Sequence, residues 1–314
     1  MRLLLWHVHG SWTTAFVRSG HTCLLPTVDD RGPWGRGRCG RDWPGTAVEV
    51  PHDRLRGADV DAVVLQRPEE LDLTERWLGR RPGTDLPAVY VEHNTPREHA
   101  ATTRHPLAGR DDIPIVHVTH FNELMWDNGI APTVVIEHGV VDPGYRYTGE
   151  LPHAAALINE PVRRNRIVGA DLLGVFGEVA PVDLYGIGTE GFTAPGVTPV
   201  GDLPQDRLHP HMARRRVYLH TARWTSLGLS LIEAMHLGMP VVAVNSTEAA
   251  TAVGEDAGVV STDLARLAPA VRTLCEQPDL AARQGKCARE HALARFGLDT
   301  FLHRWDVLLD RLLS

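Results

Sequence analysis

The sequence has little lysine, few cysteines and no excess of positive charge. Lys286 is the only lysine among 314 residues, so arginine carries nearly all the basic charge. The net charge is 32 − 39 = −7, which argues against nucleic-acid or anionic-membrane partners. Any phosphate that side chains hold must therefore be held by arginine or histidine.

The chain also lacks the patterns of a zinc site, a secretory signal or a membrane span. The four cysteines have no CxxC or CxH spacing, which predicts reduced thiols at Cys23, Cys39, Cys275 and Cys287. The N-terminal MRLLLWHVHGSW has a short apolar run without a cleavage pattern. No stretch approaches the roughly 20 apolar residues of a membrane helix. These features predict a cytoplasmic protein without stable membrane insertion.

Short apolar runs alternate with helix-like stretches, which is the pattern of a parallel sheet covered on both faces. The first series of strands is expected at 3–8, 62–65, 88–91, 115–118 and 134–136, with helices at 69–78 and 120–128. The second series is expected at 154–158, 182–185, 217–219, 240–244 and 258–260, with helices at 229–237 and 264–277. Residues 31–44 have no periodicity and predict a long surface loop.

This length and alternation favour two α/β domains. The turn-rich segment 142–152 is the best linker, so we predict a first domain at 1–148 and a second at 149–297. The amphipathic stretch 298–314 is expected to complete the first domain as a terminal helix. Both domains would be doubly wound and Rossmann-like, with a central cleft at the carboxyl ends of their sheets.

The segment 221–260 carries the most information. It reads as a strand end, a loop, a helix, a tight stop and a strand. Gly228 permits close backbone approach, Ser230 is a suitable N-cap, and Gly238 suits the left-handed position after the helix. The start of this helix would leave N–H groups at residues Gly228, Leu229 and Ser230 for an anion such as a diphosphate.

The same segment resembles the donor-site signature of the GT4-type, retaining glycosyltransferases of the GT-B fold, also called glycosyl transferases group 1. The family pattern E-G-F-G-L-x-L-x-E-A-M-A-x-G-x-P-V-V-A aligns with T-S-L-G-L-S-L-I-E-A-M-H-L-G-M-P-V-V-A here. The resemblance implies that Glu233 binds the ribose hydroxyls of the nucleotide. Thr225 replaces the family glutamate that contacts the donor sugar, so it could offer a hydrogen bond but no charge.

Glu233 has a second interpretation. Ser230-x-x-Glu233 also fits a capping box, in which the glutamate only closes the start of the helix. On the tetrapeptide alone the two interpretations are balanced, whereas the longer match favours ribose binding.

The stretch LINEPVRRNRIVGADLL at 157–173 resembles the family run G-R-L-x-x-x-K-G-x-D-L-L. This alignment implies that Arg163 binds phosphate. The family lysine falls on Val168, and the nearby Arg164 and Arg166 could compensate. We select Arg163 and Arg166 as the cationic clamp, although a solvated basic loop would have the same composition.

In the first half, AVYVEHNTPR at 88–97 resembles the family strand that ends in a histidine, which implies that His93 orients the donor sugar. A packed or surface histidine is the alternative. Gly10 stands in the first βα turn, where it could let the backbone approach a sugar or phosphate. His7 and His9, with the His209-Pro-His211 run, allow a metal site, but no third ligand has diagnostic spacing, so no metal is expected.

The resemblance implies transfer of a sugar from a nucleotide-diphosphate (NDP) sugar to an acceptor with retained configuration. No protein nucleophile or metal cofactor is needed, because arginine and the helix dipole can neutralise the leaving diphosphate. A soluble small molecule or saccharide is the expected acceptor. The alternatives are another GT-B enzyme, such as an epimerase or phosphorylase, and a sugar-nucleotide or glycan-binding protein that has lost catalysis. Thr225 and Val168, which replace a glutamate and a lysine of the family pattern, favour a binding protein without catalysis.

Overall fold

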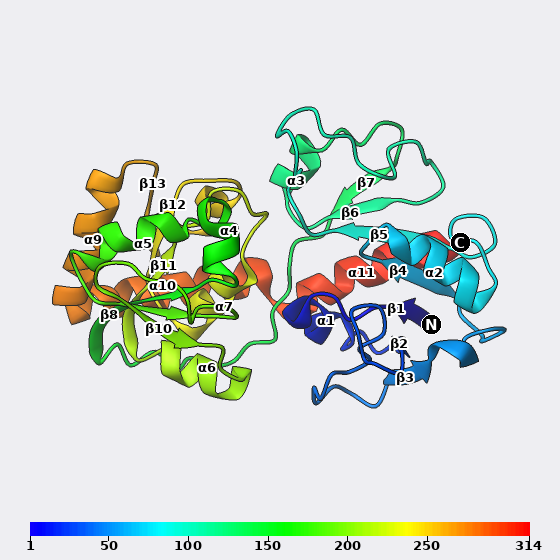
Figure 1. Ribbon diagram of the computed structural model, residues 1–314, viewed down its shortest axis with the longest axis horizontal. Coiled ribbons are helices and arrows are strands. Elements are labelled where there is room, and N and C mark those ends of the chain that lie inside the picture. Colours follow the sequence, from blue (N-terminus) through cyan, green and yellow to red (C-terminus); the bar gives the residue numbers. More distant parts are fainter. The chain divides into compact units, whose positions relative to one another are not determined.

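The computed structural model describes the whole chain, Met1–Ser314, and divides into two compact units (Figure 1). Residues 1–141 and 298–314 form the first domain, and residues 142–297 form the second. The boundary lies a few residues before the one that the turn-rich segment suggested. The central cleft between the two domains stays a prediction.

The first domain contains a seven-stranded parallel sheet in the order β3-β2-β1-β4-β5-β6-β7. Its strands are β1 (Arg2–Leu5), β2 (Thr22–Thr27), β3 (Ala47–Pro51), β4 (Ala62–Leu65), β5 (Ala88–Glu92), β6 (Ile115–His117) and β7 (Thr133–Val135). Its helices are α1 (Gly10–Phe16), α2 (Glu69–Leu78), α3 (His120–Met125) and α11 (Leu298–Leu313). The four residues of β4 are all buried, as a strand covered on both faces requires.

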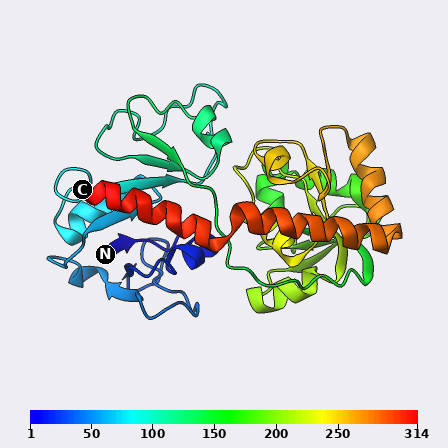
Figure 2. The same cartoon turned by 180° about the vertical axis from the view of Figure 1, so that it is seen from behind.

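Helix α11 closes one face of this sheet, whereas α2 lies on the other face (Figures 1 and 2). Its buried residues Phe301, Trp305 and Leu309 recur every four positions and so lie on one side of the helix. The Trp305 ring packs at 5.8 Å from the Trp12 ring and 5.0 Å from the Phe16 ring, nearly edge to face with both. The C-terminal segment therefore supplies part of the core of the first domain.

Replacing Trp305 with alanine should lower the free energy of unfolding of the first domain by about 3–5 kcal/mol, because the change leaves a cavity among aromatic rings. Urea unfolding followed by tryptophan fluorescence measures this domain, since every tryptophan except Trp224 lies in it. Val307→Ala, at an exposed position of the same helix, is the control and should change stability by less than about 0.5 kcal/mol. Equal losses in the two variants would contradict the assigned packing.

The second domain has a six-stranded parallel sheet in the order β10-β9-β8-β11-β12-β13. Its strands are β8 (Leu151–Leu157), β9 (Val182–Tyr185), β10 (Val197–Gly201), β11 (Arg215–His220), β12 (Val241–Val244) and β13 (Gly258–Ser261). Its helices are α4 (Pro161–Val168), α5 (Leu173–Gly177), α6 (Gln205–Met212), α7 (Leu229–Leu237), α8 (Ala249–Ala252), α9 (Leu264–Glu276) and α10 (Pro278–Phe296). Both sheets have the strand order 3-2-1-4-5-6 of a dinucleotide-binding fold, extended by one strand in the first domain.

Several elements have the predicted bounds. The strands β4 and β9 and the helices α2, α7 and α11 begin and end where the sequence pattern placed them. The strands β2, β3 and β10 and the long helix α10 were not predicted. The loop 31–44 has no helix or strand, but it is not all on the surface, because Gly35, Gly37 and Trp43 are buried.

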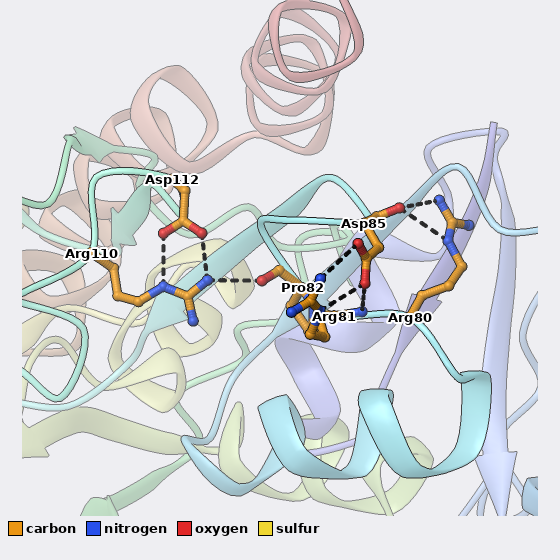
Figure 3. A network of polar contacts seen from close by, with 6 residues as sticks. All are labelled: Arg80, Arg81, Pro82, Asp85, Arg110 and Asp112. Carbon is orange, nitrogen blue, oxygen red and sulfur yellow. Dashed lines mark hydrogen bonds and ion pairs between the residues drawn. The ribbon is translucent and has the colours of Figure 1, made fainter.

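The loops that enter β5 and β6 are fastened at the amino edge of the first sheet (Figure 3). Arg110 Nε donates to Asp112 Oδ1 at 2.7 Å, and the same guanidinium reaches the carbonyl oxygen of Pro82. Arg81 pairs with Asp85 at 2.9 Å. These side chains are one-third to more than one-half exposed, so the pairs stabilise the domain only modestly. Ligands of such sheets bind at the opposite, carboxyl edge.

Candidate functional site

The strand order of the second domain changes direction where β8 and β11 lie side by side, because the chain continues from these two neighbouring strands toward opposite edges of the sheet. Ligands of such sheets bind outside the carboxyl ends of the strands at this kind of position, which makes it the candidate site. The segment after β8 leads into α4, and the segment after β11 leads into α7. The donor-site residues predicted from the sequence in this domain all lie on these two connections.

Backbone contacts tie the two connections together. Gly169 has a φ of 71°, and a Cβ atom there would lie 1.8 Å from the carbonyl oxygen of Thr221. Thr221 Oγ1 donates to the carbonyl oxygen of Val168 at 3.1 Å, and the Arg223 amide donates to Ile167 at 2.9 Å. The Arg223 guanidinium also forms an ion pair with Asp171. Only glycine fits at position 169, and the two loops form one rigid unit.

Helix α7 begins at Leu229, and its N-cap residue is Gly228, with no side chain capping it. The prediction that Ser230 is the N-cap is therefore wrong. Ser230 lies inside the first turn, and its Oγ accepts a hydrogen bond from the Tyr218 hydroxyl at 2.9 Å. The extended conformation of Gly228 ends the preceding loop, and the first amides of the helix point away from its body. The helix start keeps the partial positive charge expected for an anion site.

Glu233 lies one turn into α7 and is only 6% exposed. Its Oε2 is 3.3 Å from Nε2 of His209 on α6. The capping-box interpretation is wrong, because the residue that would share the box, Ser230, is not at the N-cap. A carboxylate only accepts hydrogen bonds, and hydroxyl groups are among the donors that it can accept from.

Arg163 and Arg166 lie on α4, beside the same edge, and are highly exposed. The Arg163 side chain is 71% exposed and forms an ion pair with Glu160, and the Arg166 side chain is 76% exposed and lies 3.3 Å from Asp171. The Arg163 guanidinium lowers the pKa of the Glu160 carboxyl. Both arginines can turn toward an anion at little cost in burial, but each has a carboxylate neighbour that competes for it.

The first domain has an equivalent position between β1 and β4. His9 and Gly10 follow β1, Gln66 follows β4, and His93 follows β5. Gly10 is the first residue of α1, and a Cβ atom there would lie 2.3 Å from Nη2 of Arg41. The guanidinium of Arg41 thus occupies the space above Gly10 that was expected to admit a ligand.

His93 is buried among other rings. Its Nε2 lies 3.0 Å from Oε1 of Gln66, and its ring centroid lies 4.1 Å from that of His9, 5.3 Å from that of Trp12 and 6.1 Å from that of His138. Burial and the neighbouring histidines hold the pKa of His93 well below its usual value. The imidazole is therefore neutral near pH 7 and can only exchange hydrogen bonds with a ligand, without contributing charge.

The histidines considered as metal ligands have other partners. His7 Nδ1 lies 3.0 Å from the carbonyl oxygen of Gly37, and His211 Nδ1 lies 2.9 Å from the Tyr185 hydroxyl. No group of three or more histidine, cysteine or acidic side chains is arranged to hold a metal ion.

The chain is similar in sequence to known glycosyltransferases. Residues 193–291 match the family model described as glycosyl transferases group 1. A protein of Catenulispora acidiphila named D-inositol 3-phosphate glycosyltransferase 2 is 35% identical over 306 aligned residues, which cover 93% of this chain and 64% of that protein. The chain thus spans less than two-thirds, 64%, of the length of this relative. It is similar to group 1 glycosyltransferases in residues 193–291 and to this relative over most of its own length.

Solved structures show that the two domains are those of the GT-B fold. Anabaena Alr3699/HepE in complex with UDP-glucose aligns with a TM-score of 0.73 at 16% identity, over 99% of this chain and 100% of that one. Sucrose-phosphate synthase from Thermosynechococcus elongatus aligns with a TM-score of 0.70 at 16% identity, over 99% of each chain. At this identity the likeness establishes the fold only.

Several contacts of the candidate site were not predicted from the sequence. Gln66 directly follows a buried strand, as His93 does, and that position was the available signal. Arg223 stands in the recognised segment beside Thr225, which is itself partly buried in the loop before α7. His209 was considered only as a possible metal ligand. Its contact with Glu233 was not predicted, because it joins two helices across 24 residues of sequence.

Proposed function

We propose that this protein is a group 1 glycosyltransferase that transfers a sugar from an NDP-sugar to a soluble, hydroxylated acceptor with retention of configuration. The buried Glu233 carboxylate on α7, one turn beyond a helix start without a cap, carries the proposal. A carboxylate accepts hydrogen bonds from both ribose hydroxyls, while the amides at Gly228, Leu229 and Ser230 lie where a diphosphate would follow.

The leaving diphosphate would be stabilised by Arg163, Arg166 and the start of α7, without a resident metal. Retention would follow the front-face course of the family, in which a leaving-group oxygen helps to deprotonate the acceptor and no protein nucleophile is used. His93 would orient the transferred sugar, and Thr225 would offer it a hydroxyl group in place of a carboxylate.

A soluble acceptor fits what is known of the chain. No helix is long and apolar enough to cross a bilayer. The net charge of −7 disfavours nucleic acid as a partner. We propose a cytoplasmic location, where NDP-sugars would be available as donors. The named activity of the Catenulispora relative, on an inositol phosphate, supports a small polyol or saccharide as the acceptor class.

The direct experiment is to incubate the purified protein with a panel of NDP-sugars and to measure nucleotide release, with and without a chelator. We expect slow release from one donor, unchanged by the chelator, greatly slowed in Glu233→Ala and less strongly slowed in Arg163→Ala. Release of the nucleotide with an inverted sugar product would overturn the retaining mechanism.

A second function is favoured by specific residues. Thr225 and Val168 replace a glutamate and a lysine of the family pattern, and the Val168 carbonyl is engaged by Thr221. A protein that binds sugar nucleotides without turnover would show donor binding by calorimetry and no release. Absence of binding to every donor would contradict both functions.

The exposed arginines give a prediction of their own. Arg163→Ala and Arg166→Ala together should raise the KM for the donor about tenfold or more, because each removes a charge-assisted contact to phosphate. The free energy of unfolding should change by less than about 0.5 kcal/mol, since both side chains are more than 70% exposed. Arg272→Ala, an exposed arginine on α9, is the matched control and should leave KM unchanged. An unaltered KM in the double variant would remove the arginines from the donor site.

A further inference from the structure

The side-chain amide of Gln66 has a defined orientation. Gln66 directly follows β4 and is 4% exposed. Its Nε2 donates to the carbonyl oxygen of Trp6 at 2.7 Å, and this partner can only accept. The amide nitrogen therefore faces Trp6, and Oε1 faces the opposite way. The Gln66 backbone amide donates to Glu70 Oε2 at 2.6 Å, which holds the residue in place.

The oriented amide determines the tautomer of its neighbour. Gln66 Oε1 lies 3.0 Å from His93 Nε2, and because a carbonyl oxygen only accepts, Nε2 must carry a hydrogen. A neutral imidazole has one N–H group, so Nδ1 of His93 carries a lone pair. The ring is neutral at working pH, because burial and the nearby His9 and His138 lower its pKa.

We propose that Gln66 is a positioning residue that holds His93 as the Nε2–H tautomer, so that Nδ1 accepts a hydrogen bond from a hydroxyl group of the ligand. A neutral acceptor of this kind selects O–H donors, which sugars and polyols supply, and rejects carbonyl or ether oxygens at the same position. The kinetic part of the proposal rests on the proposed function, and the tautomer itself does not.

The tautomer is measured in the free protein by long-range ¹H–¹⁵N correlation of the histidine rings. We expect His93 to show a protonated Nε2 and a bare Nδ1 from pH 6 to 8. In Gln66→Leu the hydrogen bond that fixes the tautomer is removed, and the His93 ring signals should move toward those of a mixture of tautomers. His117 serves as an internal reference, because its Nε2 faces Oδ1 of Asn128 and is not touched by the substitution.

Gln66→Glu is the second variant, which keeps an acceptor at the same place. It should preserve the protonated Nε2 and move the titration of His93 upward in pH, an effect that a purely structural role of Gln66 would not produce. Once a donor is known, Gln66→Leu should lower kcat about fivefold to tenfold, as expected for one oriented hydrogen bond.

A wild-type spectrum with the hydrogen on Nδ1, or His93 signals that are the same in Gln66→Leu and the wild type, would overturn the proposal. Both results are obtained without turnover, so they are distinct from a failure of the proposed function. If Gln66→Leu does not fold, the wild-type spectrum and Gln66→Glu still decide the question.

Discussion

Replacing Glu233 with alanine should lower kcat/KM for the NDP-sugar by about 100-fold to 1000-fold. A buried carboxylate that accepts two ribose hydroxyls loses two hydrogen bonds to a charged group, each worth about 1.5–3 kcal/mol. The substitution also leaves His209 without its partner on α7. Steady-state kinetics and calorimetric titration of the nucleotide measure the loss.

Two further variants make this test specific. Glu233→Gln keeps one acceptor oxygen and should retain part of the affinity. Glu150→Ala removes an exposed glutamate that pairs with Arg214 just before β8, at the other edge of the sheet, and should leave kcat/KM unchanged. If Glu233→Ala folds and binds the nucleotide as tightly as the wild type does, the donor site lies elsewhere.

The second large effect is acid destabilisation of the first domain. Burial lowers the pKa of His7 and of His9 to about 4, and that of His138 to about 3. In the unfolded chain these histidines titrate near 6.5, so below that pH the unfolded state binds more protons than the folded state. Stability is therefore complete above pH 6.5 and falls as the pH decreases toward 4.

The expected loss is large. At pH 5 each of the three histidines destabilises the folded state by about 1–2 kcal/mol. Burial raises the pKa of Glu70 to about 7, so protonation of this carboxyl offsets part of the loss. Urea unfolding at pH 7.5 and pH 5, followed by tryptophan fluorescence, measures the difference. His138→Asn should reduce the pH dependence, whereas His303→Asn, at an exposed position of α11, should not. Equal stability at the two pH values would contradict the burial of these neutral rings.

The sequence was most informative where local pattern and tertiary role agree. Helix α7 has a glycine stop at Gly238 with a φ of 89°, and both its bounds and the place of Glu233 on it were predicted. The strands β3 and β10 lie at sheet edges, where half-exposed residues give no continuous apolar run. Helix α10 was not predicted because its buried face consists mostly of small residues, namely Ala281, Gly285, Ala288 and Ala292, followed by Phe296.

The site residues that belong to one local sequence motif could be predicted, whereas contacts between distant segments could not. Glu233 and His93 stand in local motifs, and their places at strand and helix ends follow from those motifs. Their partners His209 and Gln66 come from distant parts of the chain, and only tertiary packing brings them within hydrogen-bond distance. The position of Arg41 could not be predicted for the same reason, since its contact with Gly10 depends on the tertiary fold of the loop 31–44.

The contact of Gly169 with the Thr221 carbonyl has a consequence for engineering. Because no other residue fits between these backbones, neither connection can be lengthened or reshaped while its neighbour stays as it is. A graft from a relative with a different donor preference would have to exchange residues 159–171 and 221–228 as a matched pair. Chimaeras that exchange only one of the two connections should be less stable than those that exchange both, as thermal unfolding would show.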